Sequence, residues 1–261
     1  MAEKETKNNP KSVIEAVPEA VEELAKEIST SEEITIKEEK LTAKKEAIIS
    51  WIPKTKLGKQ VKAGEVKNID IILEEGKKIL EPEIIDSLLN IESELLLVGQ
   101  AKGKFGGGKR RAWRQTQKKT QEGNIITFST MVVVGDKNGY VGIGYGKAKE
   151  TLPAREKALR QAKLNIIKIN RGFEDPADTA KNDPHTIPFK VEGKCGSVRI
   201  TLFPAPRGTG LAVADECKKI LRLAGIKDIY SRTIGQTRTT FNLAKACLDA
   251  LIKTKKIIRQ K

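Results

Sequence analysis

The chain has 261 residues, and its 49 lysines and arginines exceed its 34 aspartates and glutamates, giving a formal net charge of +15. A surplus of this size is typical of proteins that bind a polyanion or a charged membrane surface. No stretch reaches the roughly 18 apolar residues needed to cross a membrane, and the first ten residues lack the apolar core of a secretion signal. The three cysteines form no close pair, which argues against a disulfide framework and favours a reducing, cytoplasmic setting.

The positive charge is concentrated in the carboxyl-terminal part of the chain. Residues 1–50 hold 8 basic and 12 acidic side chains, residues 51–98 hold 7 and 9, and residues 99–261 hold 34 and 13. We therefore expect the polyanion to bind within residues 99–261. Residues 1–46 contain no aromatic side chain, and they cannot bury enough apolar surface to offset the entropy of ordering. We expect them to form a disordered acidic tail.

Residues 47–94 are interpreted as a helical extension. Pro82 suits the first turn of a helix, and Ile84, Ile85, Leu88 and Leu89 then fall on one face. A strand is expected to begin within residues 95–98, which opens a first domain over residues 95–172.

Residues 99–124 combine glycines with lysines and arginines, and no acidic residue interrupts them before Glu122. Glycines let a backbone approach closely, and cations on flexible side chains can follow phosphates. RNA contact is favoured over a solvated disordered stretch. Trp113 could stack on a base or anchor the segment. The expected contacts are Lys102, Lys104, Lys109, Arg110, Arg111, Arg114, Lys118 and Lys119.

Residues 125–145 alternate between apolar and polar positions around a turn at residues 135–139, which predicts a β-hairpin. Its second strand carries a stripe formed by Gly142, Gly144 and Gly146, so a helix or an RNA backbone must pack closely there. A helix is favoured. The following segment, from Pro153, has a narrow seam of small or apolar residues at Ala154, Ala158, Ala162 and Ile166.

Residues 173–186 are interpreted as a linker, and residues 187–261 as a second domain with the order ββαβα. Its strands are expected at residues 187–192 and 197–203, joined by a turn at residues 193–196, and at residues 226–230. Its helices are expected to begin near Leu211 and at Thr239. The fold class is therefore α+β.

Two glycine-containing loops are candidate phosphate-binding sites. The segment from Gly142 to Lys147 does not have the spacing of a nucleotide-binding P-loop. The loop of Arg207, Gly208 and Thr209 precedes the expected helix, where backbone amides and an arginine could hold a phosphate of RNA or ATP. RNA is favoured, because no acidic residue is placed to hold a metal ion.

Neither catalysis nor metal binding is indicated by the remaining reactive residues. His185 is the only histidine, and no cysteine lies at ligand spacing from it. Cys217 and Cys247 fall on apolar helix faces, where buried thiols are expected. No catalytic residue, metal ligand or cofactor is therefore predicted.

Several long motifs resemble one family. Residues 129–150 (STMVVVGDKNGYVGIGYGKAKE) resemble the core of the universal small-subunit ribosomal protein S-five family. The segments PHTIPF, GKCGSVR, PAPRGTG and AGIKD, from residue 184 to residue 228, resemble its archaeal and eukaryotic branch in the same order. The segment SRTIGQTRTT, residues 231–240, is most like archaeal members, and the resemblance covers about residues 51–255.

The resemblance implies a structural constituent of the small ribosomal subunit with no enzymatic activity. It implies an amino-terminal domain like a double-stranded-RNA-binding fold and contact with rRNA near the neck and the messenger entry. It also implies support of decoding accuracy, and neighbours among messenger RNA and ribosomal proteins S-two, S-three, S-four and S-eight. Lys118, Lys119 and Thr120 match the family's loop that reaches rRNA. The remaining expected RNA contacts are Lys147, Arg207, Gly208, Thr209, Arg232 and Arg238.

The chain departs from the family at two places. Residues 103–114 are longer and richer in glycine and lysine than the family pattern, and residues 173–183 lack the cysteines of some archaeal relatives, so no zinc site is expected. Two other functions compete with the ribosomal one. They are a stand-alone regulator or chaperone that binds double-stranded RNA, and a nucleotide-dependent kinase built on the second domain.

Overall fold

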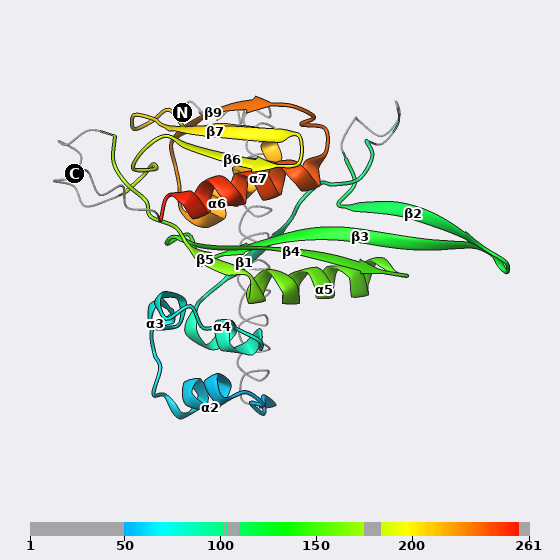
Figure 1. The fold of residues 1–261 in the computed structure, drawn as a ribbon, viewed down its shortest axis with the longest axis horizontal. Helices are drawn as coiled ribbons and strands as arrows, with labels where there is room; N and C mark the ends of the chain where they lie inside the picture. Colours follow the sequence, from blue (N-terminus) through cyan, green and yellow to red (C-terminus); the bar gives the residue numbers. More distant parts are fainter. Residues whose placement is uncertain (1–49, 102, 104–109, 175–183, 256–261) are drawn as a thin grey trace, which may run out of the picture. The chain divides into compact units, whose positions relative to one another are not determined.

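The computed structural model describes residues 50–101, 103, 110–174 and 184–255. Backbone contacts divide the chain into one unit that ends at Ile52 and a second unit from Pro53 onward. The expected tail, together with Lys102, Lys104 and Lys109, lies outside the described residues. The second unit contains helices and two β-sheets, so the α+β class is confirmed (Figure 1).

Three short helices precede the first sheet: α2 (Lys56–Ala63), α3 (Ile69–Glu74) and α4 (Glu83–Leu88). The helix expected near Pro82 is confirmed as α4. Two ion pairs join these helices to later elements: Lys168 Nζ lies 2.7 Å from Asp70 of α3, and Lys163 Nζ lies 2.5 Å from Asp86 of α4. The extension is therefore fixed to the first sheet and its helix.

The first sheet is antiparallel and contains β1 (Glu92–Leu95), β2 (Trp113–Thr120), β3 (Gly123–Gly135), β4 (Tyr140–Ala148) and β5 (Ile166–Lys168). Its order is β1-β3-β4-β5, and β2 pairs with the first half of β3. The β3–β4 hairpin is confirmed. The strand expected from Leu95 is wrong, because β1 ends there.

Strand β2 lies within the basic residues 99–124, where no strand was predicted. Its polar residues form a strand because β3 supplies a partner for each one, from Trp113 opposite Thr130 to Thr120 opposite Gly123. Halfway along, the hydroxyls of Thr116 and Thr127 lie 2.8 Å apart across the two strands. Such cross-strand pairs stabilise a sheet without an apolar alternation in the sequence.

Helix α5 (Thr151–Leu164) covers one face of the first sheet and packs directly on the glycine stripe of β4. A Cβ atom added at Gly144 would lie 2.0 Å from the carbonyl oxygen of Ala158, and one added at Gly146 would lie 2.0 Å from that of Ala154. The expectation that a helix occupies this face is confirmed.

The second sheet contains β6 (Val191–Cys195), β7 (Val198–Pro204), β8 (Leu211–Ala212) and β9 (Ile229–Ile234), in the order β6-β7-β9-β8. Helices α6 (Asp215–Ala224) and α7 (Thr240–Lys253) pack on each other, and α7 also packs on β6 and β7. Strands β6, β7 and β9 are antiparallel, whereas β8 runs parallel to β9. The final helix is confirmed.

Several boundaries in this domain differ from the expected ones. Strand β6 begins at Val191 and not at residue 187, and β9 covers Ile229–Ile234 and not residues 226–230. The hairpin turn is Gly196–Ser197, and Gly193 lies inside β6, because it allows close packing on α7. The short strand β8 makes the order βββαβα. Helix α6 begins at Asp215 because residues 211–212 first pair with β9.

A continuous apolar core joins the two sheets. Its buried residues include Met131 and Val133 of β3 together with Ile220 and Leu221 of α6. Hydrogen bonds cross the same boundary: the carboxylate of Glu216 accepts from the Leu97 amide at 2.8 Å, and Lys219 Nζ donates to the carbonyl oxygen of Leu95 at 2.9 Å. In the described part of the chain, no helix has the length and apolar character required to span a bilayer.

Candidate nucleic-acid interface

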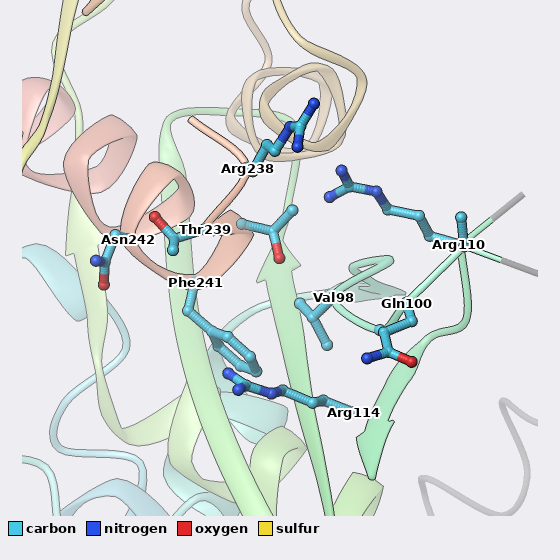
Figure 2. Close-up of a pocket in the computed structure, with 11 residues that line it drawn as sticks. Val98, Gln100, Arg110, Arg114, Arg238, Thr239, Phe241 and Asn242 are labelled. Carbon is cyan, nitrogen blue, oxygen red and sulfur yellow. The ribbon is translucent and has the colours of Figure 1, made fainter. Parts of the chain in front are cut away.

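Two adjoining hollows form a groove between the first sheet and the start of α7. The larger, of about 500 Å³, is lined by residues 98–101, Arg110, Arg114 and residues 238–242. The smaller, of about 310 Å³, shares Arg114 and Phe241 and adds Thr116, Ser129, Tyr145, Lys147 and Lys245. We call these two hollows together the basic groove. Figure 2 shows the larger of the two.

Arg110 is placed in the groove by pairing between the two ends of the glycine- and lysine-rich segment. Ala101 and Arg110 form an isolated antiparallel bridge, and the Gly99 amide donates to the carbonyl oxygen of Arg111 at 2.9 Å. A Cβ atom at Gly99 would lie 2.2 Å from the carbonyl oxygen of Trp113, so this close crossing requires glycine. The crossing holds Arg110 at the edge of the groove.

Arg114 is placed by strand alternation. Its neighbour Trp113 packs with the guanidinium of Arg155, which lies 5.7 Å from the centre of the indole ring. Because successive side chains of a strand point to opposite faces, Arg114 points away from α5 and into the groove. Trp113 therefore anchors β2 on α5, which was one of its two expected roles.

Arg238 enters the groove from the turn before α7. The Thr239 hydroxyl donates to the carbonyl oxygen of Gln236 at 2.7 Å, and the Thr240 amide donates to that of Arg238 at 3.0 Å. The first turn of α7 contains no acidic residue, so the partial positive charge of its amino terminus adds to that of the arginines. Figure 2 shows Arg110 extending toward Arg238, with Arg114 beside Phe241.

Two aromatic rings lie in the groove among the cations. Tyr145 and Phe241 meet edge to face, with ring centres 5.4 Å apart and planes at 74°. Tyr145 is 41% exposed, so part of its ring is open to a ligand. Aromatic rings beside cations suit an RNA strand, whose bases stack and whose phosphates need positive charge.

Within the part of the chain that the structure describes, no acidic residue lines either hollow of the basic groove. Among the described residues, Arg110, Arg114, Lys147, Arg238 and Lys245 form no ion pair with a carboxylate. Another hollow shares Arg110 and Thr240 but is lined by Asp215 and Glu216. These carboxylates would repel a phosphate, so the favourable region for an anion lies on the Arg114 side.

The structure does not bring all the expected contacts into the groove. Lys118, Lys119 and Thr120 lie near the tip of the β2–β3 hairpin, beyond the last pair between β3 and β4, Phe128 with Ala148. Figure 1 shows this two-stranded ribbon projecting past α5. Both lysines are exposed. Arg111 lines a further hollow of about 270 Å³ with Trp113, and this hollow shares Arg114 with the groove.

The loop of Arg207, Gly208 and Thr209 does not lie at a helix start, which corrects the geometry expected for its anion site. It leads into β8, and the amide of Gly210 already donates to the buried carboxylate of Asp228 at 2.8 Å. Arg232 is also away from the groove, because it lies on β9 of the second sheet.

Three groove residues were missed by the sequence reasoning: Tyr145, Phe241 and Lys245. The periodicity places Tyr145 and Phe241 on the apolar faces of a strand and a helix, so it gives no sign that they line a site. A signal for Lys245 exists, because it lies one helical turn after Phe241 in α7. Within the described residues, no group of three histidine, cysteine, aspartate or glutamate side chains could hold a metal ion.

Comparison with known proteins identifies the family of this chain. Residues 112–170 match the model "Ribosomal protein S5, N-terminal domain", and residues 193–260 match "Ribosomal protein S5, C-terminal domain". The small ribosomal subunit protein uS5 of Nanoarchaeum equitans is 50% identical over 207 residues, which cover 79% of this chain and 88% of the relative. The chain belongs to the ribosomal protein S5 family.

Other archaeal members of the S5 family align over a similar length. The uS5 protein of Methanothermobacter thermautotrophicus is 47% identical, over 79% of this chain and 89% of its own. That of Methanocaldococcus jannaschii is 45% identical, over 78% and 87%. The expected archaeal character is therefore confirmed. The S5 family is structural and not enzymatic, which removes the kinase alternative.

Proposed function

We propose that this chain is a structural constituent of the small ribosomal subunit and that its basic groove holds an rRNA strand. Membership of the S5 family supports the subunit and its rRNA as the setting. The observation that carries the rRNA site is the convergence of Arg110, Arg114 and Arg238 on one hollow that has no acidic lining residue.

The mechanism is neutralisation of phosphates combined with base stacking. Arginine offers a planar set of donors that can bind two phosphate oxygens at once, and each neutralised phosphate releases counterions. The amino terminus of α7 adds positive potential at the same place. Tyr145 offers its exposed ring to a base, while Phe241 supports that ring from the side.

Contacts outside the groove complete the proposal. Lys118, Lys119 and Thr120 would reach a second rRNA segment from the projecting ribbon, and Arg207 with its loop would touch a third. On the basis of the family resemblance, the chain would lie near the neck and the messenger entry and support decoding accuracy. Its neighbours would be messenger RNA and ribosomal proteins S-two, S-three, S-four and S-eight.

The division into domains is proposed in the same way. The helical extension would cover residues 47–94, the domain like a double-stranded-RNA-binding fold residues 95–172, the linker residues 173–186 and the second domain residues 187–261. Packing of α5 on the antiparallel sheet supports the likeness of the first domain to that fold.

The salt dependence of rRNA binding tests the groove. The double variant Arg114→Ala/Arg238→Ala should bind a small-subunit rRNA transcript more weakly, because two phosphate contacts are lost. The slope of log K against log [KCl], measured by filter binding, should fall by about 1 to 2.

The matched control is Lys218→Ala/Arg222→Ala on α6, which removes the same charge outside the groove. This variant should keep the slope of the unchanged chain. Equal slopes for the two double variants would show that the groove does not hold the rRNA.

A further inference from the structure

The outer face of the second sheet is a candidate second RNA site, separate from the basic groove. On β7, Val198, Ile200 and Leu202 are buried on the inner face, on the side that α7 covers. Because strand side chains alternate, Arg199, Thr201 and Phe203 point to the opposite face. Neither helix of this domain occupies that face.

The rows of this outer face follow from the strand register. Phe203 of β7 lies opposite Tyr230 of β9, Thr201 lies opposite Arg232, and Arg199 lies opposite Ile234. On the other side of β7, Lys194 of β6 is the partner of Arg199. We call Lys190, Lys194, Arg199, Phe203, Tyr230 and Arg232 the aromatic sheet face.

Two aromatic residues occupy facing positions on this face. Opposite residues of neighbouring antiparallel strands have Cβ atoms about 5 Å apart, so Phe203 and Tyr230 extend from the same row of the outer face. Tyr230 is 44% exposed, and Phe203 is partly buried. The ammonium group of Lys190 lies 5.1 Å from the centre of the Phe203 ring.

The positive charge of this face favours a polyanion over a protein as its ligand. Lys190, Lys194, Arg199 and Arg232 are all exposed, and Glu192 is the one carboxylate among the outward positions of β6, β7 and β9. In the described residues, none of these four cations forms an ion pair. A protein partner would have to bury these charges at a cost, whereas a polyanion neutralises them.

We propose that the aromatic sheet face binds an unpaired strand of rRNA. Two of its bases stack on Tyr230 and Phe203, and Arg199, Arg232 and the lysines contact the phosphates. An unpaired strand is favoured over a duplex, because only unstacked bases present their faces to aromatic side chains. The proposed function enters only in the choice of rRNA as the source of the strand.

A binding experiment with the full chain tests the aromatic sheet face. The probe is a fluorescently labelled single-stranded RNA of 12 nucleotides, compared with the same sequence as a duplex. Tyr230→Ala should weaken binding of the single strand about tenfold, because one stacked base is lost, while Tyr230→Phe should keep it. Binding of the duplex should be the same for all three chains.

Two further variants separate this site from the groove and from misfolding. Arg232→Gln should also weaken single-strand binding, and unchanged circular dichroism shows that each variant is folded. In Arg114→Ala/Arg238→Ala, replacing Tyr230 by Ala should still produce its tenfold loss. If neither Tyr230→Ala nor Arg232→Gln weakens binding of the single strand, the aromatic sheet face does not bind RNA, whether or not the basic groove does.

Photo-crosslinking identifies the occupant in the assembled particle. The change Tyr230→benzoylphenylalanine places a crosslinker on the aromatic sheet face, and the chain is then assembled into small subunits. A crosslink to unpaired rRNA nucleotides supports the proposal. Crosslinks found only to protein, to messenger RNA or to paired rRNA would overturn it, as would no crosslink.

Discussion

Single glycines determine how closely helix α5 approaches the first sheet. Gly142, Gly144 and Gly146 alternate with side chains that point to the other face of β4, and each meets backbone of α5 where a side chain would be. The helix contributes Ala154, Ala158 and Ala162 to the same contact, all fully buried. Small residues on both surfaces bring two backbones together, so this contact cannot adapt by moving a flexible side chain.

Replacement of Gly144 tests this contact. In Gly144→Ala the new methyl group would overlap the backbone of Ala158 and Ala162, so α5 must shift away from the sheet. We expect a loss of unfolding free energy on the order of 3 kcal/mol, measured by urea denaturation.

The control is Gly103→Ala, where an added Cβ has no described atom within 4 Å and the φ angle suits an alanine. This variant should unfold at nearly the urea concentration of the unchanged chain. An equal midpoint for both variants would mean that α5 does not pack on β4 at this distance.

An ion pair and a hydrogen bond fix helix α3 to the first sheet. The Tyr140 hydroxyl donates to the Asp70 carboxylate at 2.6 Å, and Lys168 Nζ lies 2.7 Å from the other oxygen. Burial raises the pKa of Asp70, but the hydrogen bonds from Lys168 and Tyr140 outweigh it, so the net pKa lies below the usual value. Burial and the hydrogen bond to Asp70 raise the pKa of Tyr140.

Acid should therefore loosen α3. Because the pKa of Asp70 is lower in the folded chain, its contribution to stability is present above its unfolded pKa of about 3.9 and is lost as the pH falls through the folded pKa. Tyr140→Phe removes one hydrogen bond and should raise the folded pKa of Asp70. Carboxyl NMR titration measures this pKa, and acid unfolding should begin at a higher pH.

Tyr145→Phe serves as the control for this titration, because the Tyr145 ring lies in the groove, packed edge to face on Phe241. It should leave the titration of Asp70 unchanged. If both phenylalanine variants titrate alike, the Tyr140 hydroxyl does not lower the pKa of Asp70.

Elements with a long and regular pattern could be predicted from the sequence. The β3–β4 hairpin has alternating residues and a turn rich in glycine, and α7 presents an apolar face along its whole length. Strand β2 could not be predicted, because its residues are polar on both faces and its order comes from pairing with β3. The start of α6 was missed because two residues paired with β9 precede it.

The candidate site was predictable only in part for a related reason. The cations of Arg110, Arg114 and Arg238 are visible as charge in the sequence. The sequence does not show that they meet in space. Arg110 and Arg114 are more than a hundred residues from Arg238, and only the tertiary fold brings the three to one hollow. Phe241 could not be recognised as a groove residue, because helical periodicity does not distinguish a core position from the wall of a groove.

The two sheets of the second unit share one apolar core between them. Two family models cover it separately, yet buried residues of α6 pack with residues of β3 and β4, and backbone hydrogen bonds such as Lys137 to Leu223 cross the boundary. A shared core means that neither sheet keeps its apolar face covered when the other unfolds. We therefore expect the two sheets, with α6 and α7, to unfold in one cooperative transition.

Glu216 is the residue through which this coupling can be measured. It is 8% exposed, it accepts the hydrogen bond from the Leu97 amide, two residues after β1, and it lies 3.7 Å from Lys219, which donates to Leu95 of β1. Glu216→Ala leaves the Leu97 amide without this acceptor, which should cost about 1–3 kcal/mol. Asp215→Ala, one residue earlier, removes a carboxylate whose side chain is 89% exposed and should cost less than about 1 kcal/mol.

Hydrogen exchange measures the stability of both sheets in one experiment. Glu216→Ala should lower the protection of amides in β4 and in β7 by the same free energy, because both open in one transition. A loss confined to β7 and α6 would show that the two sheets unfold separately and that their common core does not couple them.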